Sequence, residues 1–175
     1  MEQNYISDDV FEQIKYFIPW KLTEEQGLLI NKLIQNEELK RRYEKYGLCE
    51  ECRQPSTGDY WCKSCNSKRF QQSFKNWTGK NSDVDKLIQT SQLNAKNQYG
   101  KLEWIEYDRF ENVEYIAKGG FGKIHKADWK DGYIMKWNYK ANKWDRCGSM
   151  VVALKCLNNS KEVTSKFLNE VGNIL

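Results

Sequence analysis

The chain of 175 residues lacks any apolar run long enough to cross a bilayer, and it lacks the basic and apolar segments of a signal peptide. It also lacks a strong charge of one sign, because 28 lysines and arginines stand against 24 aspartates and glutamates. Charge alone therefore makes no strong case for a nucleic-acid-binding arm. Internal repeats and low-complexity tracts are absent as well. Together these absences predict a soluble protein of the cytoplasm or nucleus, without a membrane partner.

The apolar content that is present suffices for a folded chain. Hydrophobic residues make up 39% of the sequence and aromatic residues 14%, and the length allows one domain or two small ones. The chain has six cysteines. In a reducing compartment we expect these to be thiols or metal ligands rather than disulfides.

We predict an α+β chain in four segments. These are a helical segment over residues 1–46, a four-cysteine segment over 47–81, a helix and linker over 82–109, and a strand-rich segment over 110–175.

Helix signals define the first and third segments. Thr23 and Gln26 form a capping-box pattern, which predicts one long helix that continues to Gly47. Pro19 separates it from a shorter helix near residues 8–17, and Ser82 is the expected N-cap of the helix in the third segment. The apolar stripe of the long helix can bind a partner, but we expect it to pack on the rest of the protein.

Two C-x-x-C pairs dominate the second segment. Cys49-Glu50-Glu51-Cys52 and Cys62-Lys63-Ser64-Cys65 each present two thiolates to one ion, and together they supply the four ligands of a structural zinc site. The alternative for a single pair is a redox motif, which the absence of a βαβ pattern disfavours. A closed four-cysteine site leaves no position for a catalytic water, so a zinc enzyme is not expected. Cys147 and Cys156 are expected to be plain thiols, with Cys156 buried in a strand.

Basic and aromatic residues are interleaved in the same segment. That composition occurs in single-strand nucleic-acid binders. The interpretation that we favour is that the aromatic residues form the small core that the zinc knuckles otherwise lack. The residues concerned are Tyr60, Trp61, Phe70, Phe74 and Trp77.

Three motifs follow in order in the fourth segment. Ile116-Ala117-Lys118-Gly119-Gly120-Phe121-Gly122-Lys123-Ile124 is a glycine-rich turn between two expected strands, Glu111–Lys118 and Lys123–Trp129. Val151–Cys156, which contains Val-Ala-Leu-Lys, is an expected buried strand. A helix with Glu170 is expected after it.

The order and spacing of these motifs resemble the N-terminal lobe of the eukaryotic protein-kinase family. The four-cysteine segment ahead of them looks like that of fungal kinase-like proteins. The resemblance implies an antiparallel kinase N-lobe sheet with an αC-like helix, ATP as ligand, and transfer of a phosphoryl group to Ser, Thr or Tyr hydroxyls of a protein substrate. A structural β-hairpin with a chance Val-Ala-Leu-Lys is the alternative.

The resemblance also implies roles for single residues. Lys155 would bind the ATP phosphates, and Glu170 would orient Lys155 as the second catalytic residue. The residues that would enclose ATP are Ile116, Ala117, Gly119, Gly120, Phe121, Gly122, Ile124, Ala153 and Lys155. Neither an H-R-D nor a D-F-G motif occurs, so the base and the Mg²⁺ ligands are missing and residues 1–175 alone should not transfer phosphate.

The segment departs from the family pattern in two places. Ala117 stands where the first glycine of the loop belongs, which narrows the conformations open to the loop. The gap between Gly122 and Lys155 is about twice the usual one. We expect the excess, Asp128–Ser149, to form a further hairpin that extends the sheet, with a turn at Asp131-Gly132. The alternative roles of the hairpin are a docking edge or, as we favour, packing of its own aromatic face.

A second function remains open beside the kinase hypothesis. In it the chain is a non-catalytic zinc-containing module that binds a protein or RNA, and the kinase-like lobe is a remnant.

Overall fold

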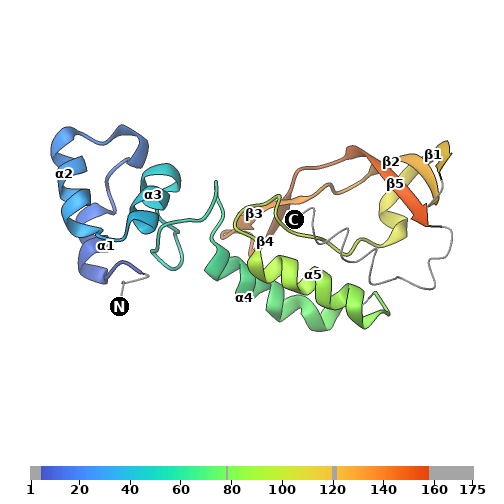
Figure 1. The fold of residues 1–175 in the computed structure, drawn as a ribbon, viewed down its shortest axis with the longest axis horizontal. Helices are drawn as coiled ribbons and strands as arrows, with labels where there is room; N and C mark the ends of the chain where they lie inside the picture. The colour runs from blue at the N-terminus through green and yellow to red at the C-terminus, as the bar shows by residue number, and fades with distance from the viewer. Residues whose placement is uncertain (1–4, 78, 120–121, 158–175) are drawn as a thin grey trace.

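The structure is a computed structural model that describes residues 5–77, 79–119 and 122–157. It is α+β and consists of three parts that follow one another along the longest axis (Figure 1). Helices α1 to α3 form the first part, α4 and α5 with the hairpin β3–β4 form the second, and strands β1, β2 and β5 form the third. None of the helices in the described ranges is both long enough and apolar enough to cross a membrane.

Three short helices build the N-terminal part, a helical unit with its own core. Its helices are α1 (Asp8–Ile14), α2 (Glu24–Leu33) and α3 (Glu37–Tyr46), and a 3-10 turn (Pro19–Lys21) lies between the first two. The capping box of Thr23 and Gln26 is confirmed. The buried residues of the core are Ile6, Ile14, Ile30, Ile34, Leu39 and Tyr43.

The expectation of one helix up to Gly47 is wrong. The chain leaves helical geometry at Ile34, whose φ is −111° and ψ is 91°, and the Asn36 side chain then accepts a hydrogen bond from the Leu39 N–H as the N-cap of α3. Two helices that meet at an angle bury Ile34 and Tyr43 in one core, which a straight helix could not do. Gly47 does end α3, with φ at 70°.

Helices α4 (Lys63–Ser73) and α5 (Ser82–Asn94) lie side by side in the second part (Figure 1). A 3-10 turn (Phe74–Asn76) follows α4. The N-cap of α5 is Asn81 rather than the expected Ser82, because the Asn81 side chain accepts hydrogen bonds from the N–H groups of Asp83 and Val84.

The third part is an antiparallel sheet of three strands in the order β1-β2-β5. Strands β1 (Phe110–Gly119), β2 (Gly122–Trp129) and β5 (Met150–Leu157) match the three strands expected from the sequence. A 3-10 turn (Tyr107–Arg109) precedes β1. Two register irregularities interrupt the β1–β2 pairing, between Glu111 and Glu114 and between Tyr115 and Ala117.

The long insertion does form a hairpin, but it does not extend this sheet. Strands β3 (Ile134–Asn138) and β4 (Lys143–Arg146) make a separate two-stranded sheet. Its turn lies at residues 139–142, where the Asn138 side chain accepts a hydrogen bond from the Ala141 N–H. Gly132 instead lies where the chain enters the hairpin, with φ at 63° and so close to Gly148 that a side chain would collide with the backbone there.

Aromatic contacts explain where the hairpin lies. Trp144 of β4 stacks on Phe70 of α4 with 4.8 Å between the ring centroids, and on Trp61 with 5.9 Å. Trp61 and Phe70 are buried together with Ile134. Trp61, Phe70 and Phe74 therefore do form a core, which the insertion hairpin completes. The expectation is wrong for Tyr60, which is 80% exposed, and Trp77 is not among the residues of this core.

Candidate functional site

The four cysteines come in two pairs, one from a turn after α3 and one from the start of α4. The first turn, which follows α3, holds Cys49 and Cys52. Its backbone closes through hydrogen bonds from the Cys49 N–H to the Gln54 carbonyl, at 2.8 Å, and from the Arg53 N–H to the Cys49 carbonyl, at 2.9 Å. Arg53 has φ at 62°, a left-handed conformation that brings the chain round after the second cysteine.

The second turn is the start of α4. Cys62 is the N-cap residue of that helix and Cys65 lies in its first turn. The Thr57 side chain accepts a hydrogen bond from the Lys63 N–H at 3.0 Å and so fixes the entry into the helix. The N-terminus of a helix favours negative charge, which suits two thiolates.

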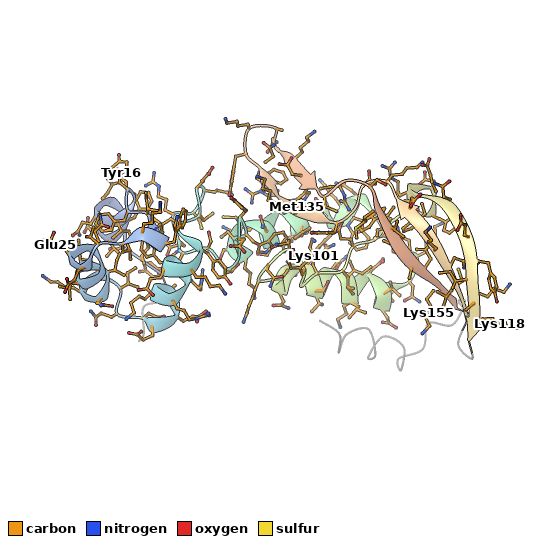
Figure 2. The ribbon with its side chains drawn as sticks, turned by 90° about the horizontal axis from the view of Figure 1, so that it is seen from above. Tyr16, Glu25, Lys101, Lys118, Met135 and Lys155 are labelled. Carbon is orange, nitrogen blue, oxygen red and sulfur yellow. The ribbon has the colours of Figure 1, made fainter. Side chains whose placement is uncertain are left out.

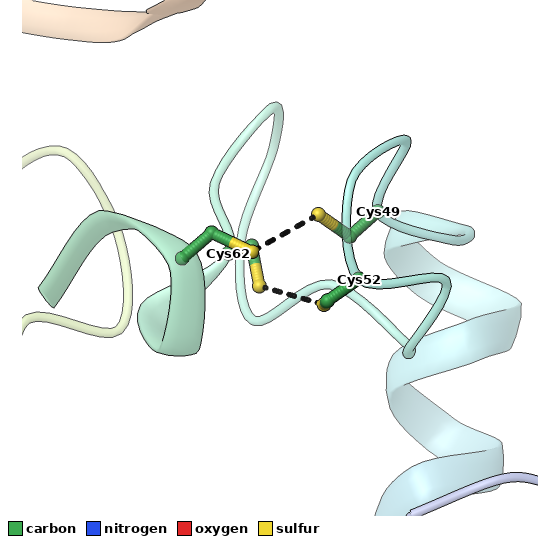
Figure 3. Close-up of side chains that lie close together, drawn as sticks. Cys49, Cys52 and Cys62 are labelled. Atoms are coloured by element: carbon green, nitrogen blue, oxygen red, sulfur yellow. Dashed lines mark hydrogen bonds between the residues drawn. The ribbon is translucent and has the colours of Figure 1, made fainter. Parts of the chain in front are cut away.

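All four sulfur atoms lie within 4.8 Å of one another (Figure 3). Two sulfur–sulfur contacts join one turn to the other: Cys49 Sγ is 3.8 Å from Cys65 Sγ, and Cys52 Sγ is 3.5 Å from Cys62 Sγ. Four sulfurs around one zinc ion at the usual bond length are about 3.8 Å apart. The cluster therefore has the size that a tetrahedral metal ion such as zinc requires.

The geometry disfavours the redox alternative. These two sulfur contacts run between the C-x-x-C pairs instead of joining the cysteines within a pair, and none of the six cysteines is in a disulfide. Cys49, Cys62 and Cys65 are buried and Cys52 is half-buried. The chemistry of this donor set is that of a closed structural site.

Without a bound cation, ionisation of one thiol of the cluster opposes ionisation of its neighbours. Hydrogen bonds from Cys52 and Cys62 lower the pKa of Cys49, whereas hydrogen bonding to Cys49 and Cys52 raises the pKa of Cys62. Burial raises the pKa of Cys65. A bound divalent cation removes this conflict because each coordinated thiol is then held as the thiolate.

The cluster lies at the junction between the first two parts of the molecule. Gln54, next to the first turn, exchanges two hydrogen bonds with the backbone of Ile6 in the helical unit. Arg42 of α3 donates to the carbonyls of Pro55 and Ser56. The second turn belongs to α4, so an ion held by all four cysteines ties the helical unit to the helices and hairpin beyond it.

The sheet brings several of the expected nucleotide-binding residues together. Ile124 of β2 pairs with Ala117 of β1 on one side and with Lys155 of β5 on the other. Residues directly opposite one another in antiparallel strands project to the same face, so these three side chains share a face. Ala153, two residues before Lys155, shares it too.

This face lies next to the glycine turn, since Gly119 pairs with Gly122 where β1 and β2 meet it. Lys118 and Lys155 are found at the same end of the sheet in Figure 2. Ile116 is the extra residue of the β1 bulge between Tyr115 and Ala117, and its side chain is 57% exposed. Gly120, Phe121 and Glu170 lie outside the described residues.

Two further thiols stay away from the cluster. Cys147 and Cys156 are both exposed. The expectation that Val151–Cys156 is a buried strand, with Cys156 buried in it, is wrong. None of these residues is buried, because the sheet is not covered over this strand within the described residues.

Sequence reasoning missed the side chains that join the hairpin to its surroundings. Lys101 is 8% exposed, and its ammonium donates to the carbonyls of Gln98 at 2.8 Å and Ile134 at 3.1 Å. Burial lowers the pKa of Lys101, and an ion pair with Glu103 at 3.1 Å compensates for part of that cost. Lys101 is found in the middle of the molecule in Figure 2.

Tyr139 and Arg69 were missed as well. The Tyr139 side chain contacts Cys49 from the hairpin turn, and Arg69 of α4 lies over the ring of Tyr139. No local pattern signals such contacts, because Tyr139 is 90 residues from Cys49 in the sequence.

Comparisons of the chain with models of protein families, with curated proteins and with solved structures found no match.

Proposed function

We propose that residues 110–175 are the nucleotide-binding part of a protein-kinase N-terminal lobe, and that the four cysteines hold a structural zinc ion. The observation that carries the first proposal is the register that sets Ala117, Ile124 and Lys155 side by side next to the glycine turn. It supports the arrangement that ATP needs, with a lysine for the phosphates at the end of an apolar surface for the base.

The exposure of this face fits a ligand. Ile124 is 36% exposed and Val151, on the same strand and face as Lys155, is 59% exposed. Apolar strand residues that remain open to water beside a lysine are what an adenine ring and its phosphates would cover.

The proposed activity of this chain is limited to binding. Lys155 holds the α- and β-phosphates, and Glu170 orients Lys155, as the family resemblance implies. Transfer of the γ-phosphoryl group to a protein hydroxyl requires a base and Mg²⁺ ligands from H-R-D and D-F-G motifs, which residues 1–175 do not contain.

Binding of a fluorescent ATP analogue to the zinc-loaded chain tests the nucleotide proposal. Lys155→Met is expected to weaken binding at least tenfold, because it removes the charge that meets the phosphates. Lys123→Met is the matched control: it removes the same charge from the opposite face, where Lys123 pairs with Cys156. Equal affinity of Lys155→Met and the unmodified chain would contradict the proposal, as would equal losses in both variants.

A groove at the junction favours the second candidate function, a module that binds a partner. It is a cavity of about 690 Å³ between the helical unit, the cysteine turns and the hairpin. Trp20 and Tyr60 line it and are 72% and 80% exposed. Tyr60 also has φ at 53°, so a conformation that costs energy holds an exposed ring at this site.

The charges of the groove favour a protein over RNA as that partner. Both lysines and carboxylates line it. They include the lysines Lys136 and Lys140 and the acidic residues Glu50 and Asp59. Phosphates would be repelled by the carboxylates, whereas a protein segment with charges of both signs and an apolar anchor matches the lining.

Site-specific photocrosslinking tests this second function. A photoreactive phenylalanine analogue in place of Tyr60 is expected to capture one defined protein partner. The same analogue in place of Tyr107, which is 67% exposed and precedes β1, should not. Equal capture from both positions would contradict the assignment, and salt-dependent binding of a labelled oligouridine that Tyr60→Ala abolishes would replace it with RNA.

A further inference from the structure

The turn of the insertion hairpin reaches the cysteine cluster. Tyr139, the first residue after β3, has its hydroxyl 3.7 Å from Cys49 Sγ, although the two residues are far apart in the sequence. This distance is within hydrogen-bonding range for a sulfur acceptor. Cys49 is buried, and Tyr139 is the one hairpin side chain for which a hydrogen bond to a cluster sulfur is found in the described structure.

Arg69 of α4 fixes the position of that tyrosine. Its guanidinium lies over the ring of Trp137, 4.5 Å from the centroid, and over the ring of Tyr139 at 5.5 Å. The same guanidinium pairs with Glu51, which directly precedes Cys52 in the first cysteine turn. One side chain thus touches the hairpin, α4 and the first cysteine turn.

With a metal ion bound, all four cysteines would be thiolates, and the site would carry a net negative charge. Four thiolates around a divalent cation leave a net charge of about −2 on the site, spread over the sulfurs. The Tyr139 hydroxyl, as a donor to Cys49 Sγ, would offset part of that charge, and Arg69 contacts the ring of Tyr139 rather than the sulfurs. Outer-shell partners of this kind commonly change metal affinity 10- to 100-fold when they are removed.

We propose that Tyr139 is an outer-shell hydrogen-bond donor to the metal-bound Cys49 thiolate, and that Arg69 holds it there, so that the hairpin β3–β4 closes the metal site. Tyr139 is a positioning residue and not a ligand. The hairpin lies between β2 and β5 in the chain, so the metal site and the proposed nucleotide-binding sheet are linked through it. This inference is independent of ATP binding and requires only that the cluster holds a metal ion.

Competition for Zn²⁺ between the full chain and a chelating dye tests the proposal. Tyr139→Phe is expected to weaken zinc binding about tenfold while leaving its stoichiometry unchanged. Tyr133→Phe is the matched control: it removes a hydroxyl from the residue before β3, where the ring contacts Tyr99 at 5.6 Å between centroids. Arg69→Lys keeps the charge but loses the planar fork, so a smaller loss is expected.

A second readout separates the hydrogen bond from a general loss of stability. With Co²⁺ in place of zinc, the sulfur-to-cobalt charge-transfer band should shift in Tyr139→Phe and stay unshifted in Tyr133→Phe, because only the first variant removes a donor from a coordinating sulfur. Zinc affinity of Tyr139→Phe within twofold of the unmodified chain, together with an unshifted band, would overturn the proposal.

Discussion

The cysteine junction and the sheet β1-β2-β5 differ in how well the described residues bury their apolar side chains. At the junction, Trp61 is 1% exposed, the sulfurs converge, and the hairpin covers the core. On the sheet, Val151 and Ile124 remain open to water on the face that carries Lys155. The junction therefore buries its own core, whereas the sheet leaves an apolar face exposed within the described residues.

Metal removal should have the largest effect on stability, and this effect should be confined to the cysteine junction. Structural zinc sites contribute about 10–16 kcal/mol of apparent binding free energy, as much as the whole stability of a typical domain. A chelator should therefore abolish amide-exchange protection in residues 49–73 and in the hairpin, while the β1–β2 pairing keeps its protection. Unchanged exchange at the junction, or an equal loss of protection in the sheet, would contradict this prediction. Added Zn²⁺ should restore the protection.

Loss of an aromatic side chain from the shared core should rank second. Trp144→Ala removes the ring that stacks on Phe70 and Trp61, and we expect the free energy of unfolding of the zinc-loaded chain to fall by about 3–5 kcal/mol. Urea denaturation measures it. Trp20→Ala is the control, because an exposed ring at 72% should cost about 0.5 kcal/mol or less. Equal costs would show that the hairpin does not complete the core.

Alkaline pH should weaken the helical unit through Tyr43. Burial raises the pKa of Tyr43 to about 12, and its hydroxyl donates to the Ile14 carbonyl at 3.2 Å. A raised pKa means that this stabilisation is complete below pH about 10, where an unfolded tyrosine is still neutral, and is lost as pH rises through about 12. We expect a loss of about 2–3 kcal/mol across that window.

The measurement is the free energy of unfolding at a series of pH values, with Tyr43→Phe as the control. The phenylalanine variant has no hydroxyl to ionise, so its stability should lack this decline. Parallel pH profiles for the two chains would show that Tyr43 does not titrate as described.

The smallest effect should come from the start of α5. Asn81→Ala removes the side chain that caps two N–H groups and should cost about 1 kcal/mol, whereas Ser82→Ala should cost a few tenths at most. Thermal unfolding of the zinc-loaded variants measures both. A larger loss of stability for Ser82→Ala than for Asn81→Ala would show that Ser82 is the N-cap, as expected from the sequence.

Local patterns predicted much of the fold. The Thr23 capping box, the strands on both sides of the glycine turn and the two C-x-x-C pairs each depend on neighbours in the chain, and the structure contains all of them. The break before α3 was missed although Asn36 stands directly before Glu37-Glu38, a usual N-cap signature, because the apolar and charged pattern continued across it.

The position of the hairpin could not be predicted in this way. Alternating residues indicate a strand but not the surface on which it packs. The contact of Trp144 with Phe70 and that of Tyr139 with Cys49 depend on chain segments far apart in the sequence. The same limit explains why the four cysteines could be assigned as ligands while the residues that surround them could not.

Titration of the metal-free full chain with Co²⁺ shows whether the four cysteines hold one metal ion at the junction. We expect a tetrahedral cobalt–thiolate spectrum that saturates at about one equivalent and is abolished by Cys62→Ser. Cys147→Ser, which alters an exposed thiol outside the cluster, should leave the spectrum unchanged. A spectrum that survives Cys62→Ser, or no thiolate spectrum at all, would contradict a metal site at the four cysteines.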